Sequence, residues 1–169
     1  MKKLSIILFG LCLFSASLAA LELAANERKI IEKNLTLLQN GFKKGNWRSL
    51  YKVMPPKLIK PSEEWVEMFV YGMQLESKSF VLQSVEFALD NAQLEKSATE
   101  RDYLFIPMKL FWRDKQAEAM KITNGYLLAF KENKRWYFLD WWESESWNEY
   151  YQPLLRQIYP DLADIKQPP

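Results

Sequence analysis

The sequence predicts an α+β domain in which three N-terminal helices pack on a four-stranded antiparallel sheet. Apolar residues recur at helical spacing in the first part of the chain, from residue 21 to residue 73. From residue 80 onward the pattern changes to alternation of apolar and polar residues, which is typical of strands. The connections between the expected strands are short, and short connections favour antiparallel pairing of sequential strands.

Residues 1–19 have the layout of a secretory signal peptide, with two lysines, an apolar run and small residues near the end. We expect cleavage after Ala19 or Ala20, a single domain over residues 20–169, and a location in the periplasm or outside the cell. The only cysteine, Cys12, lies in the leader, so the mature domain is expected to lack disulfides and thiol chemistry. No later apolar stretch is long enough for a transmembrane segment.

Three helices are expected before the first strand. The second is short, with Asn46 as its N-cap and an end before Pro55. The third begins at Ser62, which acids follow in the first turn. The first covers residues 21–42, with apolar positions at helical spacing: Ile31, Leu35, Leu38 and Phe42.

Four strands are expected after the helices. The first covers residues 80–89 and the second residues 101–112, where Pro107 predicts a bulge or an edge position because proline cannot donate to the ladder. Residues 90–100 are polar and fit either a loop or extended strand ends. Residues 117–142 predict a hairpin of two long strands.

The hairpin has its turn around Asn133, a residue that tolerates a left-handed backbone. Apolar or aromatic side chains alternate on both of its faces. We therefore expect helices over one face and at least partial cover over the other. A short helix is also expected over residues 153–158, within an acidic and aromatic C-terminal tail.

Charge is distributed unevenly along the chain. Basic residues predominate between residues 28 and 60, and acidic residues predominate between residues 140 and 164. These are either solvated surfaces that partly neutralise each other or, for the basic helices, a surface for an anionic partner. Nucleic acid is not expected as a partner, because an exported chain without a basic-aromatic motif does not suit it. The candidate basic positions are Lys29, Lys33, Lys43, Lys44 and Arg48.

Several segments together resemble a known superfamily. They are NWRSLYKVMPP (residues 46–56), NGYLLAF (124–130), RWYFLD (135–140) and IYPDL (158–162). The order of helices, four-stranded meander and tail resembles the nuclear transport factor 2-like superfamily, also called cystatin-like α+β cones, in its uncharacterised exported bacterial branch. The resemblance implies a curved sheet that wraps the long first helix, with a pocket between sheet and helices. It implies no single function, because this scaffold carries enzymes, transport factors and binding proteins.

The amino-acid composition argues against several kinds of functional site. The chain has no histidine, and its five glycines form no phosphate-binding loop, so we expect no metal and no cofactor. Acid–base catalysis of the isomerase or dehydratase kind would depend on carboxylates and tyrosines. The nearest candidates are Asp140, Asp90, Tyr103 and Tyr126.

Asp140 lies between two aromatic residues on one expected strand face. A buried carboxylate without a partner is costly, so Asp140 indicates either a functional site or a structural role, in which it caps a turn at the strand end or pairs with Arg101 or Arg135. Tryptophan and tyrosine are concentrated between Trp136 and Tyr159. Either all of them pack in the core and hold the tail on the sheet, or those after Trp141 are anchors of an interface or of a ligand mouth. The predicted binding residues are Trp142, Trp147, Tyr150, Tyr151 and Asp140.

The sequence therefore favours an exported, non-enzymatic binding domain that engages a protein partner of the envelope or medium, or a small apolar ligand, through the aromatic end of the sheet. The alternative is a small-molecule isomerase or dehydratase that uses carboxylates and tyrosines in the pocket of the cone. Folds of this shape commonly dimerise through the open sheet face, so the choice between monomer and homodimer stays open.

Overall fold

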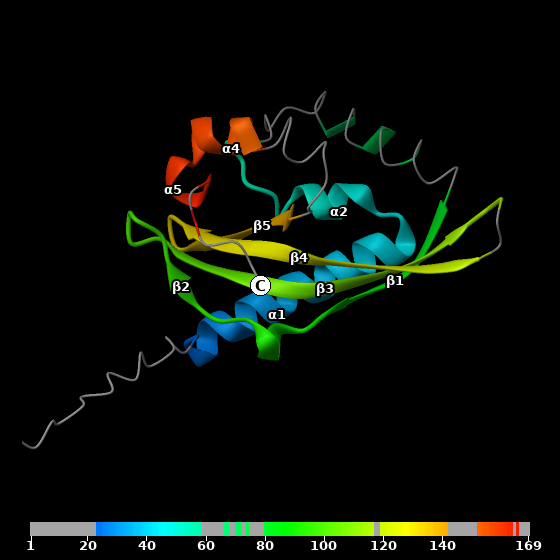
Figure 1. Cartoon of the computed structure of the whole chain (residues 1–169), viewed down its shortest axis with the longest axis horizontal. Helices are drawn as coiled ribbons and strands as arrows, with labels where there is room; N and C mark the ends of the chain where they lie inside the picture. The colour runs from blue at the N-terminus through cyan, green and yellow to red at the C-terminus, as the bar shows by residue number, and fades with distance from the viewer. Residues whose placement is uncertain are drawn as a thin grey trace, which may run out of the picture.

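The computed structural model describes residues 23–58, 66–67, 70–71, 74, 80–116, 119–141, 152–163 and 165. Figure 1 shows a curled sheet with the long helix α1 behind it and the helices α4 and α5 at one end. Along the chain the elements are α1 (Ala25–Lys44), α2 (Trp47–Tyr51), β1 (Phe80–Phe87), the short 3-10 helix η1 (Leu89–Asn91), β2 (Glu95–Lys96), β3 (Asp102–Asp114), β4 (Met120–Glu132), β5 (Arg135–Trp141), α4 (Gln152–Ile158) and α5 (Pro160–Ala163).

Helix α1 turns one apolar stripe towards the sheet, as its helical spacing predicts. Ile31 is fully buried, and Leu35 and Leu38 are almost so. The helix ends at Gly45, whose φ of 63° is a left-handed conformation that glycine adopts without strain. A Cβ on Gly41 would lie 2.8 Å from the side chain of Leu50 in α2, so this glycine allows α1 and α2 to approach closely.

The sheet is antiparallel, with strand order β1-β3-β4-β5, and β2 pairs with β3 where β1 no longer does. The four predicted strands are present, but the two-residue β2 makes a fifth, which its polar sequence did not reveal. The predicted hairpin is confirmed as β4 and β5. Its turn, Asn133 and Lys134, has φ values of 51° and 64°, a left-handed pair that matches the twist of the flanking strands.

The prediction that Pro107 marks an edge or a bulge is wrong, because Pro107 lies in β3, between β1 and β4. The register with β1 ends at Met108, and the N–H of Ala88 donates to the carbonyl oxygen of Pro107 at 2.9 Å. The backbone side that lacks an N–H therefore faces the end of β1, where no ladder bond is lost. A register shift between β1 and β3 lies at Leu82 and Ser84 instead.

Both faces of the sheet are covered by helices at one end, as the two apolar hairpin faces predict. The face towards α1 and α2, here called the α1 face, buries Leu104, Ile106, Leu127, Ala129, Trp136 and Phe138. The opposite face, here called the α4 face, buries Tyr103, Leu128, Phe130 and Leu139 against Leu155, Tyr159, Leu162 and Ile165. The fold has three layers at this end of the sheet.

The predicted placement of three helices before the sheet needs correction. Helices α1 and α2 precede the sheet, whereas α4 and α5 follow it, because its second apolar face also needs cover. The helix expected from Ser62 falls mainly outside the described residues, although residues 66–67, 70–71 and 74 have helical backbone. The short helix expected over residues 153–158 is confirmed as α4. Within the described residues, no helix is both long and apolar enough to cross a membrane.

Candidate functional site

Among the described side chains, three of the four candidates for acid–base catalysis, Asp90, Tyr103 and Tyr126, are not brought together. Tyr103 and Tyr126 pack on the α4 face, whereas Asp90 is exposed on η1. Asp140 pairs with Leu127 in the backbone register of β4 and β5, and its side chain lies outside the described part of the protein. The described side chains therefore offer no assembled acid–base pair among these candidates.

Tyr103 makes a structural contact rather than a catalytic one. Its side chain is 3% exposed, and its hydroxyl donates to Glu95 Oε2 at 2.5 Å. Burial and this hydrogen bond raise the pKa of Tyr103 above its ordinary value, so the phenol stays protonated near neutral pH. The bond joins β2 to β3 at the edge of the sheet.

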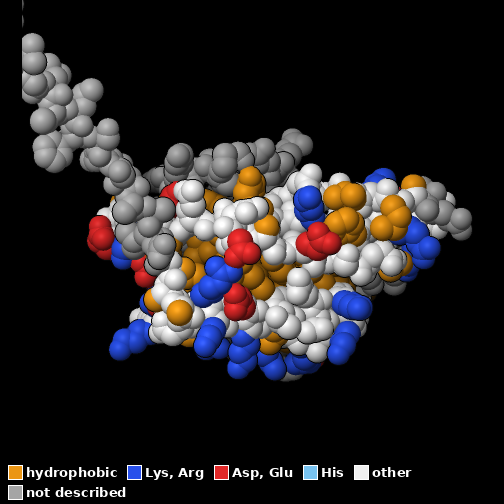
Figure 2. Space-filling model, turned by 90° about the horizontal axis from the view of Figure 1, so that it is seen from below, with side chains coloured by type: hydrophobic (Ala, Val, Ile, Leu, Met, Phe, Trp, Pro, Cys, Tyr) orange, Lys and Arg blue, Asp and Glu red, His pale blue; other side chains and the backbone are white. Residues whose placement is uncertain are grey.

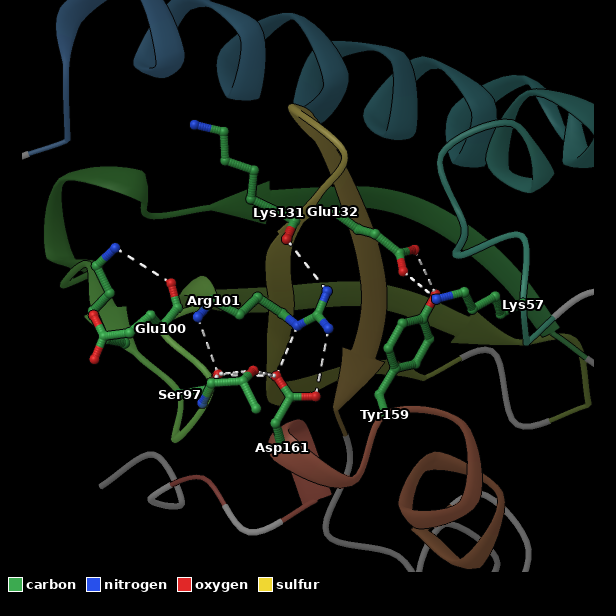
Figure 3. Close-up of polar contacts among 10 residues, drawn as sticks. Lys57, Ser97, Glu100, Arg101, Lys131, Glu132, Tyr159 and Asp161 are labelled. Carbon is green, nitrogen blue, oxygen red and sulfur yellow. Dashed lines mark hydrogen bonds and ion pairs between the residues drawn. The ribbon is translucent and has the colours of Figure 1, made fainter.

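The described polar side chains meet most densely where α5 contacts the sheet (Figure 3). There Asp161 Oδ2 accepts hydrogen bonds from Ser97 Oγ at 2.9 Å, Thr99 Oγ1 at 2.8 Å and Arg101 Nε at 2.8 Å. Burial acts to raise the pKa of Asp161, but the bonds from Arg101, Thr99 and Ser97 outweigh it and hold that pKa below its usual value. We call these four residues the Asp161 cluster.

A second set of contacts extends the Asp161 cluster towards the turn between β4 and β5. The hydroxyl of Tyr159 donates to Glu132 Oε2 at 2.9 Å, and Lys57 Nζ lies 2.5 Å from Glu132 Oε1. Lys57 and Arg101 each lie 5.3 Å from the centroid of the Tyr159 ring. Burial acts to raise the pKa of Glu132, but the bonds from Lys57 and Tyr159 outweigh it, so the carboxylate stays ionised.

These contacts are internal to the protein, and they fasten the C-terminal helices to the sheet. Arg101, one of the two arginines that the sequence offers as a partner for Asp140, forms an ion pair with Asp161. Arg135, the other, lies 5.7 Å from the centroid of the Tyr137 ring. Across the described residues, no three or more His, Cys, Asp or Glu side chains are grouped so as to hold a metal ion. The arrangement is that of a structural clamp.

Exposed apolar side chains gather at the opposite end of the sheet. Met120 and Ile122 of β4 are 57% and 60% exposed. Phe111 of β3 stands directly across from Ile122 in the register and is partly exposed. Paired residues share a face, so these three side chains lie on the α4 face, beyond the part that α4 and α5 bury. We call Phe111, Met120 and Ile122 the sheet-end surface.

Element length explains why this surface is exposed. Strand β4 has 13 residues and is about 43 Å long at about 3.3 Å per residue. Helix α4 has seven residues and is about 10 Å long, and α5 is shorter still. These two helices cover the end near Phe130 and cannot reach the end near Met120.

On the α1 face, the same ends of β3 and β4 are linked by contacts of the Trp112 side chain. Trp112 Nε1 donates to Thr123 Oγ1 at 2.9 Å, and Lys121 Nζ lies 4.9 Å from the centroid of the Trp112 ring. Figure 2 shows hydrophobic side chains at this end of the molecule with Lys and Arg side chains around them. Exposed bases here are Lys109, Arg113, Lys115 and Lys121.

The basic positions predicted on the first two helices are all exposed. Lys29, Lys33, Lys43 and Lys44 lie on α1, and Arg48 on α2 forms an ion pair with Glu67. Figure 2 shows Lys and Arg side chains along the helical side of the molecule. Exposure of these side chains fits both a solvated face and a surface for an anionic partner. The salt dependence of binding separates the two interpretations.

Most of the predicted binding residues lie outside the described residues: Trp142, Trp147, Tyr150 and Tyr151. The tail that carries them begins directly after Trp141, the last residue of β5, whose backbone pairs with Tyr126 of β4. The sequence analysis did not predict the sheet-end surface. It correctly placed Met120 and Ile122 on the same apolar face as Leu128, but it did not predict that these two side chains are exposed while Leu128 is buried. The signal that could have revealed it was the length of the alternating pattern, which exceeds what short C-terminal helices can cover.

Comparison of the chain with protein-family models and with curated proteins finds no match. The resemblance of the sequence to nuclear transport factor 2-like cones therefore stays a prediction from the order and pattern of its segments. A shared α+β arrangement does not carry a function from one protein to another.

Proposed function

We propose that this protein is an exported binding domain that engages a protein partner through the sheet-end surface. The observation that carries the proposal is the pair of large apolar side chains, Met120 and Ile122, each more than half exposed on one strand. Together with Phe111 they form a local apolar surface among basic residues, and such surfaces are typical of protein interfaces.

A protein partner fits these residues better than a small ligand does. Small ligands are bound in concavities that bury most of their surface. Side chains that are more than half exposed instead suit a broad partner surface. Full burial of an apolar side chain contributes about 1.5–3 kcal/mol, so completing the burial of Met120 and Ile122 would contribute roughly half of that for each.

The aromatic tail belongs to the same proposal. Trp142 follows directly on Trp141, whose backbone pairs with Tyr126, and Tyr126 is separated by three residues from Ile122 along β4. We propose that Trp142, Trp147, Tyr150 and Tyr151 contribute anchors to the interface, because tryptophan and tyrosine are enriched among residues that dominate binding energy. Asp140 stays a candidate member of this interface.

Export supports an envelope or extracellular partner. Residues 1–19 combine lysines, an apolar run and small residues in the order of a cleaved leader. Mass spectrometry of periplasmic and secreted material should find a mature N-terminus at Ala20 or Leu21. Material that began at Met1 would contradict export.

The binding proposal is tested with a double variant and a matched control. Met120→Asp with Ile122→Asp places two charges in the sheet-end surface, whereas Ile30→Asp makes the same kind of change at a 47% exposed position on α1. All three positions are exposed, so the melting temperature should change little. Tagged protein recovered from envelope extracts should retain its partner in the wild type and in Ile30→Asp and lose it in the double variant. Equal recovery from all three forms would contradict the proposal.

A further inference from the structure

Helix α1 turns a row of lysines away from the sheet. Its apolar stripe packs on the sheet through buried side chains, and a line of exposed polar residues runs along the opposite side of the helix at spacings of three, four or seven. The structure describes α1 over its whole length. We call Lys29, Lys33, Lys43 and Lys44 the lysine row. The exposed line consists of Asn26, Lys29, Lys33, Asn40 and Lys44, with Lys43 beside Lys44.

The acids of α1 lie beside the lysine row and bind other bases. Glu27 forms an ion pair with Lys131 of β4, and Glu32 Oε1 accepts from Arg28 Nε at 2.9 Å. Among the described residues, none is hydrogen-bonded to or ion-paired with the ammonium groups of the lysine row. The four side chains are exposed to solvent, so their positive charges are presented at the surface.

Stability of the helix does not account for all of these charges. Lys43 and Lys44 lie in the last turn of α1, where cations are favourable beside the helix C-terminus. Lys29 and Lys33 lie in the first half of α1 at a spacing of four, and like charges at that spacing repel each other on a helix. An anionic surface would relieve this repulsion, which points to a role of the row in binding.

The chemistry and shape of the lysine row favour a lipid surface over an acidic protein. The row contains lysine only, a compact charge on a flexible stem, whereas recognition of protein carboxylates favours the planar fork of arginine. The one arginine of α1, Arg28, is bound to Glu32 and Asp90. The row is about 22 Å long at about 1.5 Å per residue and lies on the convex side of a helix. Such a row can meet several lipid phosphates in one plane without a concave site.

The lysine row and the sheet-end surface lie on opposite sides of the sheet. Helix α1 covers the α1 face and turns the row outward, whereas Met120 and Ile122 stand on the α4 face. Figure 2 shows Lys and Arg side chains in a row along the lower edge of the molecule. A protein that lies on a membrane through this row turns its sheet-end surface away from the bilayer.

We infer that the lysine row is a docking surface for an anionic phospholipid membrane, on which α1 lies with its axis parallel to the bilayer. This inference goes beyond the proposed function, because it concerns the other side of the molecule and does not depend on the sheet-end surface. Each base near an anionic bilayer strengthens binding about fivefold, and salt weakens the binding by screening.

Sedimentation with lipid vesicles measures this binding for the mature chain, residues 20–169. At low salt the wild type should bind vesicles of equal parts phosphatidylglycerol and phosphatidylcholine, and it should not bind vesicles of phosphatidylcholine alone. Lys29→Gln with Lys33→Gln should raise the apparent Kd about 25-fold. The control, Lys109→Gln with Arg113→Gln, removes the same charge from exposed positions on the α4 face and should stay close to the wild type. All four positions are exposed, so these changes should leave the fold intact.

A second measurement reports which side of the molecule meets the bilayer. The mature chain contains no cysteine, so Asn40→Cys and Asn124→Cys each provide a single site for a fluorophore that brightens in apolar surroundings. Asn40 is exposed between the lysines of the row, whereas Asn124 is exposed on the α4 face. Phosphatidylglycerol vesicles should brighten the label at position 40 and leave the label at position 124 unchanged.

Several results would overturn docking through the lysine row. Equal binding to both kinds of vesicle, equal weakening by the control substitutions, or equal brightening of both labels would each do so. No binding to the phosphatidylglycerol vesicles would also overturn it, and capture of poly-glutamate in that case would assign the row to an acidic protein. The proposed function is tested separately, by partner recovery with Met120→Asp and Ile122→Asp.

Discussion

The side chain of Asp161 on α5 is 6% exposed, and its carboxylate binds Arg101 beside β3. The substitution Asp161→Ala removes this contact between α5 and the sheet. The change leaves the guanidinium of Arg101 without its ion-pair partner and removes the acceptor for two hydroxyl groups, those of Ser97 and Thr99. Ser97 is itself buried, so its hydroxyl cannot turn freely to water. The helix α5 should then hold less firmly against the sheet.

The size of the loss follows from this burial. Removing one partner of a buried ion pair costs about 3–5 kcal/mol. Arg101 is 19% exposed and keeps its contacts with the Lys131 carbonyl and the Phe130 ring, which lowers the cost. We expect Asp161→Ala to lower the free energy of unfolding by about 2–4 kcal/mol, or the melting temperature by roughly 5–15 °C.

Urea denaturation and thermal melts followed by circular dichroism measure this loss. The matched control is Asp90→Ala, which removes a carboxylate whose side chain is 84% exposed and ion-paired with Arg28 at the surface. An exposed pair contributes little, so the control should stay within about 0.5 kcal/mol of the wild type. If Asp161→Ala is as harmless as Asp90→Ala, the clamp does not stabilise the fold.

The same site predicts a dependence on pH. The pKa of Asp161 is lowered in the folded state, so its contribution is complete above the unfolded pKa of about 4 and is lost as pH falls through the lower folded pKa. Glu132, whose pKa is also lowered, adds to this loss. The wild type should therefore lose stability below about pH 4 more steeply than Asp161→Asn does. Parallel curves for the two proteins would refute the assignment.

Three further changes test other parts of the structure. Tyr159→Phe removes the hydrogen bond to Glu132 and keeps the ring beside Lys57, so urea denaturation should show a loss of about 1 kcal/mol; a loss as large as that of Asp161→Ala would be inconsistent with this. Trp136→Ala should cost about 3–5 kcal/mol, because that side chain is 2% exposed in the core; a change below about 1 kcal/mol would argue against its burial. If the basic face of α1 meets an anionic partner, Lys29→Glu with Lys33→Glu should weaken binding most at low salt, and an affinity that ionic strength does not alter would leave only the solvated-face interpretation.

Local patterns in the sequence predicted the helices α1, α2 and α4 and the four longer strands β1, β3, β4 and β5. Alternation at Leu128 and Phe130 and at Trp136 and Phe138 revealed both apolar faces of the hairpin, since a strand turns successive side chains to opposite faces. Asn133 marked the turn through its tolerance of a left-handed backbone. These features depend on neighbours in sequence, which is why a single chain suffices to predict them.

Features that depend on contacts between distant segments could not be predicted in this way. Asp161 meets Arg101 across 60 residues, and nothing near Asp161 in the sequence names its partner. Pro107 is tolerated in a strand inside the sheet because the pairing of β1 with β3 ends next to it, at Met108. Only the register of β1 and β3 shows this. Alternation of apolar and polar residues along a strand also does not predict how far the C-terminal helices extend along the α4 face. The exposure of Ile122 could therefore not be predicted from the sequence.

The central claim, that the sheet-end surface is where a partner binds, is tested most directly by photo-cross-linking in intact cells. A photoreactive amino acid is placed at Ile122 in one strain and at Ile30 of α1 in another, with and without Met120→Asp. We expect a discrete cross-linked partner from position 122, its loss in the presence of Met120→Asp, and no such product from position 30. The same product from both positions, or a product at position 122 that Met120→Asp leaves unchanged, would contradict binding through this surface.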